Sequence, residues 1–525
     1  MEHKKQWRKI ITVARTNSPS FVLELPLKVD SSSDAELLGR FQAGRQLYNA
    51  CLNEALLRME RLKKSAPYQE ARKLPVQSKQ RSLAFSSAIR LYNFTDYDLQ
   101  AFAVLNAKRS VWIAQKLDSN SIQTLATRAF RAVERILFGK AKKVRYKVPN
   151  RFNSIENKTN KQGLRWKDNC LVWGKLTLKG IFDPSNPVHC HGLSAPVKYC
   201  RVIKRELNGK RRWFVQLVLS GTPYQKPQYQ PGDGLIGLDL NITNVAFVGD
   251  KKAGLLPFAE NVPTLEREIK TIQRAMQRSQ RANNPDNYEP DFDGRRGRRK
   301  IIKKGKVKKG SRHWKNSRTY LKLAKKKRNL ERRKSAYAKS QNRRLVNQIL
   351  KHGKHIKTEK VSVKGWQKRY GKAIGAKSPG FFQSELKRKA ENAGGSFTEF
   401  STSSTALSQT HLNGERIKKS LSLRVHYDVT GLAVMQRDLF SAYLSRFVTD
   451  NTLDVLLARN SYRGSEPILT AAWQAYQSSK RVSESESPQS QSPAERMAVK
   501  LGTVNQIANV GDKLIPTPKP ESAQL

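Results

Sequence analysis

Acidic residues, cysteines and long apolar runs are all scarce in this chain of 525 residues. No uninterrupted apolar run of about 18 residues occurs, so no membrane-spanning helix and no membrane partner are expected. The four cysteines are scattered and form no Cys-x-x-Cys pair, which argues against a disulfide framework and fits reduced thiols. The first residues have no apolar core of the kind that a secretion signal needs. We therefore expect a cytoplasmic protein.

Acids are outnumbered by bases, with 42 Asp+Glu against 100 Lys+Arg and a net charge of +58. So large a charge would destabilise a compact chain by self-repulsion unless a polyanion neutralised it. Nucleic acid is therefore the expected partner, and a ribosomal or histone-like binding protein is the simplest interpretation of the composition alone. At this length, two to four domains are expected.

The first 230 residues predict strands on either side of a helical block. Apolar residues recur at helical spacing from about residue 35 to residue 139. Strand patterns occupy residues 9–27, 144–148, 169–178 and 211–220. Asn208-Gly209 ahead of the last strand predicts a hairpin turn. We expect one small β-barrel, residues 1–32 and 140–230, split by helices at residues 33–139. A tail at residues 449–525 is predicted to be partly disordered, with a low-complexity segment at 478–493.

Three acids stand in the apolar segments of the remaining chain. Asp239 lies in Leu-Ile-Gly-Leu-Asp-Leu, Glu359 in Ile-Lys-Thr-Glu-Lys, and Asp438 in Gln-Arg-Asp-Leu-Phe. Each alone has a plainer interpretation: a buried strand end, a solvated strand residue that pairs with lysines, and a helix cap or ion pair. Desolvated carboxylates near one another repel, so their joint presence favours a divalent cation between them. Mg²⁺ takes oxygen ligands, and two such ions roughly 3.5–4 Å apart can clamp a phosphodiester that is being cut.

Together these segments resemble TnpB nucleases and the compact type V CRISPR effectors descended from them. The resemblance runs over residues 9–448 and is strongest over residues 233–448. In that family an RNase H-like (RuvC) domain carries Asp, Glu and Asp in three motifs, which match Asp239, Glu359 and Asp438. The implied fold is α+β and multidomain. It has a RuvC α/β domain at residues 231–448, with a basic helical insertion at 262–350, and a split β-barrel wedge domain with an inserted helical recognition lobe.

The resemblance implies an RNA-guided DNA endonuclease. Guide RNA would pair with target DNA beside a short flanking motif, and the three acids would bind two Mg²⁺ ions and carry catalysis. The protein would work in a prokaryotic cytoplasm at the nucleoid, in a CRISPR or transposon setting. Two alternatives remain open: a guided DNA-binding protein of the same family that cuts weakly or not at all, and a strand-transferring transposase.

The resemblance is incomplete at residues 400–435, where family members carry a zinc ribbon with paired cysteines. The corresponding positions hold His411, Asn413, Asp428 and Thr430. One His, one Asp and two weak neutral ligands are a poor set for tetrahedral zinc, which favours Cys and His. We therefore expect a ribbon-like segment without zinc. Phe440 also stands where the family has Asn.

Two basic segments are predicted to bind nucleic acid. Residues 295–344 hold 24 Lys/Arg and one acid, with aromatic residues between them, which fits phosphate neutralisation with some stacking. The resemblance implies a clamp on the backbone of the guide–target duplex; a flexible loop that binds RNA nonspecifically is the alternative. The segment after residue 139 would grip guide RNA or form a solvated strand edge. The candidates are Lys140, Lys142, Lys143, Arg145, Lys147, Arg295, Arg296, Arg298, Arg299, Lys325, Lys326, Lys327, Arg328, Arg332 and Arg333.

Overall fold

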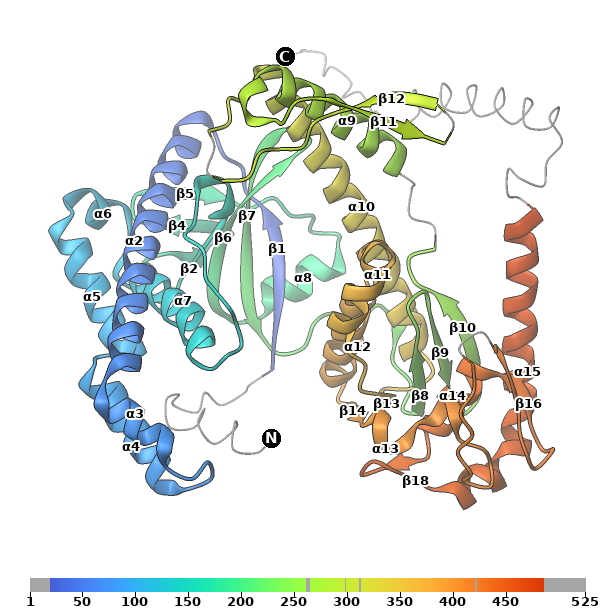
Figure 1. The fold of residues 1–525 in the computed structure, drawn as a ribbon. Helices are drawn as coiled ribbons and strands as arrows, with labels where there is room; N and C mark the ends of the chain where they lie inside the picture. The colour runs from blue at the N-terminus through green and yellow to red at the C-terminus, as the bar shows by residue number, and fades with distance from the viewer. Residues whose placement is uncertain (1–18, 261–264, 298, 311–312, 421–422, 486–525) are drawn as a thin grey trace, which may run out of the picture. The chain divides into compact units, whose positions relative to one another are not determined.

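The structure is a computed structural model that describes residues 19–260, 265–297, 299–310, 313–420 and 423–485. The chain forms two compact units, Met1–Lys226 with Leu265–Arg332, and Pro227–Thr264 with Arg333–Leu525. Both units combine helices with sheets (Figure 1), which confirms the mixed α+β class. The strand predicted at residues 9–27 is observed from Ser20 on, and its residues 9–18 lie outside the described residues.

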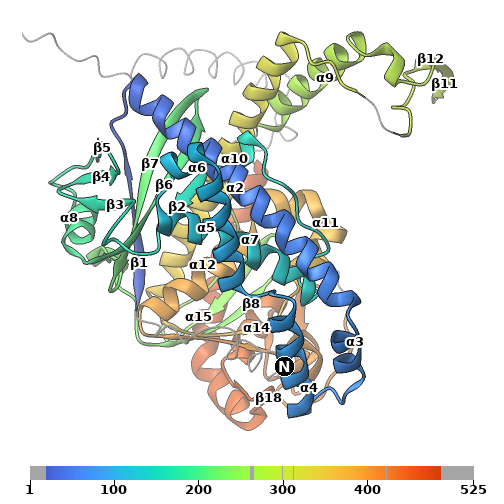
Figure 2. The same cartoon turned by 90° about the vertical axis from the view of Figure 1, so that its left-hand side faces the viewer.

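A four-stranded antiparallel sheet in the order β1-β7-β6-β2 lies in the first unit. Its strands are β1 (Ser20–Pro26), β2 (Ser154–Glu156), β6 (Val197–Leu207) and β7 (Lys210–Ser220). Asn208 and Gly209 join β6 to β7 with φ values of 48° and 75°, as a two-residue hairpin turn requires, so the predicted turn is confirmed. Figure 2 shows a second sheet and a short helix beside these strands: β3 (Arg165–Lys167), β4 (Cys170–Trp173), β5 (Leu176–Lys179) and α8 (Pro187–Ser194).

Six helices form the predicted helical block between β1 and β2. They are α2 (Ser31–Lys64), α3 (Ala66–Lys73), α4 (Lys79–Leu91), α5 (Asp96–Arg109), α6 (Val111–Lys116) and α7 (Ser119–Leu137). Side chains that accept a backbone N–H fix where several of them begin, such as Asp30 before α2 and Asp118 before α7. Phe41 of α2 packs edge-on against Trp213 of β7, with ring centroids 4.9 Å apart, so helices and sheet share one core.

The segment after α7 differs from the prediction. Residues 144–148 form a loop along α2 and not a strand. Asn49 of α2 accepts the N–H of Lys147 at 2.8 Å and donates to its carbonyl oxygen at 3.0 Å. Because one side chain satisfies both backbone groups of Lys147, this segment finds its partner in a helix side chain and has no need of a sheet.

The basic insertion groups with the first unit as far as Arg332. It contains α9 (Glu266–Ala282), η3 (Pro285–Asn287), the hairpin β11 (Phe292–Arg296) and β12 (Arg299–Lys303), and the start of α10 (Arg318–Leu350). The helix predicted in its second half corresponds to α10. The hairpin was not predicted, and the described side chains of β12 are all exposed.

A five-stranded sheet in the order β10-β9-β8-β13-β14 is the centre of the second unit. Its strands are β8 (Leu235–Leu240), β9 (Asn244–Val248), β10 (Ala253–Pro257), β13 (His355–Glu359) and β14 (Ser396–Phe400). The strands β8, β9 and β10 are antiparallel neighbours, whereas β13 runs parallel to both β8 and β14. Neighbouring residues of β9 face opposite sides, Phe247 toward one core and Ala246 toward another, so both faces of the sheet are covered.

Helices cover both faces of this sheet. The end of α10 packs on one face with α12 (Pro379–Asn392), which follows α11 (Val363–Lys377). The other face packs against α14 (Arg437–Ser445) and α15 (Val455–Ser485). The connections contain α13 (Thr402–Thr405), η4 (Leu407–Gln409) and the small hairpins β15 (Val425–Tyr427) with β16 (Val434–Gln436) and β17 (Val448–Thr449) with β18 (Thr452–Leu453).

The folded part reaches further than the sequence pattern predicted, because α15 occupies residues assigned to a tail from residue 449. Ala458, Tyr462, Leu469 and Ala472 recur at helical spacing and are buried in the core that α14 shares with the sheet. This buried stripe makes α15 part of the second unit. The remainder of the predicted tail, residues 486–525, lies outside the described residues.

Candidate active site

Parallel pairing of β8 with β13 places two of the three predicted acids side by side. Leu238 pairs with Thr358, so the next residue of each strand, Asp239 and Glu359, follows at the same edge of the sheet. Glu359 is the last residue of β13, and Asp239 is the last but one of β8. Both side chains are partly buried. The alternative that Glu359 is a solvated residue paired with lysines has no support here, since its recorded partner is a backbone N–H.

The third acid arrives on α14, whose residues are all buried. Asp438 is its second residue, and the side chain of Gln436 caps the helix by accepting the N–H of Leu439 at 2.7 Å. The close approach of α14 to β8 depends on Gly237, because a Cβ there would collide with the carbonyl oxygen of Ala442 and the hydroxyl of Ser445. The glycine of the Gly-Leu-Asp-Leu segment thus permits the contact that brings Asp438 to Asp239.

The surroundings of these carboxyl groups disfavour negative charge. Burial first, and then repulsion from Asp438 and Glu359, raises the pKa of Asp239 well above its usual range. Burial also raises the pKa of Glu359. In this environment negative charge is destabilised, and a bound cation would relieve it.

Three further groups touch the acids, and the sequence did not single them out. The amide of Asn241 donates to Asp438 at 3.3 Å, and the N–H of Leu407 donates to Glu359 at 3.3 Å. The guanidinium of Arg437 lies 3.9 Å from a carboxylate oxygen of Asp438 and lowers the pKa of Asp239. Asn241 stands two residues after Asp239, so its position was a usable signal; nothing in the sequence marked Leu407.

The donor set of this site fits a hard divalent cation. All three charged groups are carboxylates, the ligand type that Mg²⁺ prefers, and no sulfur or imidazole stands among them. Burial and the neighbouring acids raise the pKa of Asp239, and burial raises that of Glu359, so ionisation of these two groups is disfavoured without a cation. The structure places all three residues that were predicted to bind metal around one edge of the sheet, whereas the group of described residues whose possible ligand atoms all lie within 4.8 Å of one another is His411, His426 and Asp428.

The predicted ribbon positions come together only in part. His411 and Asp428 are buried neighbours and Thr430 bonds to Asp428, but Asn413 is exposed and bonds to Glu415. His426, which was not among the predicted positions, joins His411 and Asp428 in the buried cluster in place of Asn413. The possible ligand atoms of His411, His426 and Asp428 lie within 4.8 Å of one another.

The predicted nucleic-acid residues occupy three places. Lys140, Lys142, Lys143 and Arg145 are exposed on the loop after α7, and Lys147 is held against α2. Arg295 and Arg299 are exposed on the β11–β12 hairpin; Arg298, like the side chain of Arg296, lies outside the described residues. The remaining six lie along α10, where Lys325, Lys326 and Lys327 pair with Glu206, Glu268 and Glu331.

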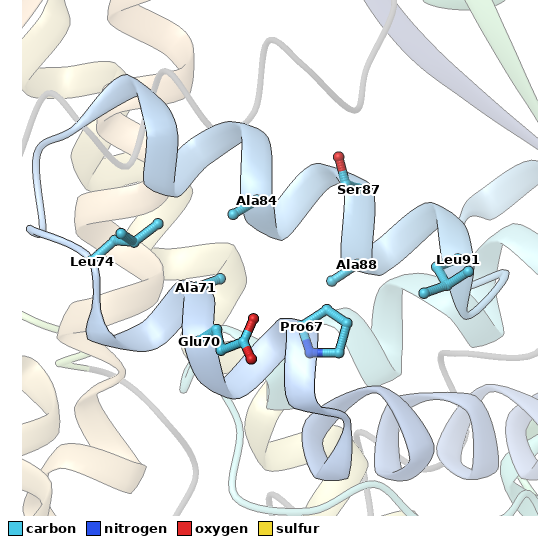
Figure 3. Close-up of a pocket in the computed structure, with 8 residues that line it drawn as sticks. All are labelled: Pro67, Glu70, Ala71, Leu74, Ala84, Ser87, Ala88 and Leu91. Carbon is cyan, nitrogen blue, oxygen red and sulfur yellow. The ribbon is translucent and has the colours of Figure 1, made fainter.

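An apolar pocket of about 600 Å³ lies between α3 and α4 of the first unit (Figure 3). Its lining residues are Pro67, Glu70, Ala71, Leu74, Ala84, Ser87, Ala88 and Leu91. It contains one charged side chain and none of the predicted catalytic residues.

Among the described residues, no helix is both long and apolar enough to cross a membrane.

Comparison with known proteins gives matches in structure alone. No protein-family model matches the chain, and no curated protein matches it. Among solved structures, a Cas12f1–sgRNA–target DNA complex is similar at 8% identity and a TM-score of 0.38, covering 82% of this chain and 99% of that one. A CRISPR-Cas12f ternary complex is similar at 10% identity and a TM-score of 0.23, covering 79% and 85%. These neighbours are compact type V CRISPR effectors, the family that the motifs resemble. At such TM-scores the likeness carries no further argument.

Proposed function

We propose that this protein is an RNA-guided DNA endonuclease of the TnpB and compact type V kind. The observation that carries the proposal is the meeting of Asp239, Glu359 and Asp438 at one edge of a sheet, with the pKa of two of them raised. An RNase H-like nuclease domain at residues 231–448, now extended by α15, fits a central sheet of mixed direction covered by helices on both faces. Residues 1–32 and 140–230 would be the wedge domain, and residues 33–139 the recognition lobe.

In this proposal the three carboxylates hold two Mg²⁺ ions, which would supply an activated water and stabilise the leaving 3′-oxygen of the DNA. The protein groups around them orient the ligands. Asn241 fixes the carboxylate of Asp438, and the Leu407 N–H fixes that of Glu359. Arg437 places a positive charge beside Asp438 and lowers the pKa of Asp239.

The proposed partners are guide RNA and target DNA. A net charge of +58 favours a polyanion as partner, and the exposed side chains of Lys140, Lys142, Lys143 and Arg145 lie on one loop where phosphates can reach them. Such contacts position a nucleic acid without reading its bases, whereas base pairing with a guide would supply the sequence specificity.

Sequencing of the RNA that co-purifies with the protein, expressed beside its native flanking DNA, tests this function. A single species with a constant scaffold and a variable end is expected. A smear of cellular RNA would contradict guided targeting and would favour an unguided nuclease or a transposase.

The same guide then allows a direct cutting assay. A duplex that matches the guide should be bound and cut in Mg²⁺. Binding of this duplex without any cut would instead support the alternative of a guided DNA-binding protein.

A further inference from the structure

The carboxylate of Asp428 is the centre of the ribbon segment at residues 400–435. Its side chain and that of His426 are fully buried, with 0% exposed. The N–H of Leu412 donates to one oxygen at 2.8 Å, and the N–H of Thr430 donates to the other at 3.0 Å. The hydroxyl of Thr430 donates to that second oxygen as well. The loops on both sides of the segment therefore close onto a single anion.

Two imidazole rings complete the surroundings of this carboxylate. Nδ1 of His411 lies 3.2 Å, and Nε2 of His426 3.5 Å, from the same oxygen of Asp428. An ionised carboxylate offers about four lone-pair sites. Two backbone N–H groups, a hydroxyl and the ring nitrogens already occupy them, so no lone pair of Asp428 is left for a metal ion.

The state of His426 is set by Lys419, whose Nζ lies 2.7 Å from Nδ1 of the ring. A lysine ammonium can only donate, so Nδ1 is the acceptor and the ring proton belongs on Nε2, facing Asp428. To bind a metal through Nε2, His426 would have to lose the proton from Nε2 and carry it on Nδ1. That proton would then point at the ammonium group of Lys419. Lys419 thus opposes metal binding both by hydrogen bonding and by charge.

Nδ1 of His411 is engaged in either tautomer, whereas its Nε2 is buried without a hydrogen-bond partner among the described residues. The N–H of Val429 approaches its Nδ1 at 3.0 Å, and Asp428 approaches the same nitrogen at 3.2 Å. Whichever of these bonds forms, the nitrogen that faces Asp428 has a protein partner. The donor set therefore does not fit the zinc that a cysteine ribbon holds.

Phe440, a departure from the family pattern, touches this core. The ring of His426 stacks on that of Phe440, with centroids 3.9 Å apart and an interplanar angle of 21°. Phe440 belongs to α14, the helix that carries Asp438. The imidazole of His426 and the phenyl ring of Phe440, which stands where the family has Asn, thus form one packed contact.

We propose that the ribbon of this protein is organised around a buried anion in place of a metal cation. Asp428 gathers the backbone of Leu412 and Thr430 and the rings of His411 and His426, and Lys419 balances its charge through His426. Through the stack on Phe440 this core supports α14. The proposal is independent of guide binding and DNA cutting.

Metal analysis and thermal unfolding of the full chain test the proposal. In Mg²⁺-free buffer, we expect substoichiometric zinc in the purified protein and the same melting temperature after EDTA or with excess zinc, because a ligand that binds only the folded state would shift it. One equivalent of zinc or another transition metal held per chain, or a lower melting temperature after chelation in this Mg²⁺-free buffer, would overturn the proposal.

A pair of variants then tests the role of the anion. Asp428→Asn keeps the size of the side chain but replaces an acceptor oxygen with an amide that faces donors, so a clearly lower melting temperature is expected. Glu415→Gln makes the same change on an exposed residue of the same segment and should leave it unchanged. Thr430→Val, which removes one donor, should give a smaller decrease if Asp428→Asn does not fold. Equal melting temperatures for Asp428→Asn, Thr430→Val and Glu415→Gln would contradict the anion-centred core.

Discussion

Two carboxylate sites in the second unit have opposite surroundings. The acidic group consists of Asp239, Glu359 and Asp438, and the saturated group consists of Asp428 with its hydrogen-bond donors. Asp239 is nearest to other carboxylates, and burial together with Asp438 and Glu359 raises its pKa. Around Asp428, burial alone would raise the pKa, but the hydrogen bonds from Thr430 and Leu412 outweigh it and lower the pKa. The first group has three carboxyl groups beside one cation, Arg437, whereas the carboxylate of the second is saturated with hydrogen-bond donors. Residue type alone therefore does not identify a metal site; unshared lone pairs do.

The largest effect is expected from breaking the contact that assembles the acidic group. Gly237→Ala places a Cβ against the Ala442 carbonyl oxygen, so α14 must shift and carry Asp438 with it. We expect roughly 1–3 kcal/mol less stability from overpacking and on the order of 100-fold slower cutting from misplacement. Urea unfolding and cleavage rates measure the two effects.

A matched control for this variant is Gly375→Ala, on α11, where no atom lies within 4 Å of the added Cβ. It should be unchanged or up to about 1 kcal/mol more stable, because alanine favours a helix. If Gly237→Ala behaved like this control, the close approach would not matter for the site.

The saturated group should be sensitive to the loss of its charge. Asp428→Asn leaves donors without an acceptor in a buried site, and we expect the free energy of unfolding to fall by roughly 3 kcal/mol. Urea unfolding with and without EDTA measures it, and the decrease should be the same in both. If Asp428→Asn lowered the free energy of unfolding only when metal is present, Asp428 would be a metal ligand like the acids of the first group.

Lowering the pH should destabilise the core around Asp428, because His426 would have to take up a proton there. Burial, and then the charge of Lys419, lowers the pKa of His426 from 6.5 to about 4, against the opposing effect of Asp428. Between these values the unfolded chain takes up a proton that the folded chain does not, so stability is present above the upper value and is lost as the pH falls. The loss is at most about 1.4 kcal/mol per pH unit.

His426→Gln isolates this contribution from all other titrations. The stability difference between wild type and His426→Gln, measured by urea unfolding from pH 7 to pH 4, should shrink as the pH falls. A difference that stays constant over this range would show that His426 does not titrate as described.

The smallest effect has the opposite sign. Because the pKa of Asp239 is raised in the folded chain, the folded chain keeps a proton that the unfolded chain gives up, and stability falls as the pH rises from the usual value of 3.8 toward the raised value. Asp239→Asn removes this titration and should stabilise the metal-free protein at pH 7 by on the order of 1 kcal/mol. The variant should also lose the stabilisation that Mg²⁺ gives the wild type. Thermal unfolding with and without Mg²⁺ checks both; a metal-free variant less stable than the wild type would contradict the repulsion.

Local signals in the sequence were enough for much of this architecture. The helical block begins at side-chain caps such as Asp30, and the turn at Asn208-Gly209 needs only its own two residues. The acids could be found because each lies in an apolar segment. The loop held by Asn49 could not, since its partner is 98 residues away.

Long-range pairing also explains what was missed at the ribbon. His426 enters the buried core because β15 pairs with β16, where it faces Met435, and only that register decides which side chains of the hairpin point inward. Asn413 matched the expected spacing and is nevertheless exposed. The buried apolar residues of α15 were not recognised as a helix pattern, because Pro467 lies within the helix and polar residues follow it.

Cleavage of a guide-matched DNA duplex by wild type and Asp239→Ala, each purified with its RNA, tests the central claim most directly. The account predicts that both bind the duplex with similar affinity, that the wild type cuts it in Mg²⁺, and that the variant is slower by two to three orders of magnitude, on the order of the loss of one preorganised electrostatic group. Equal cutting by the two proteins, or binding without cutting by the wild type, would contradict it.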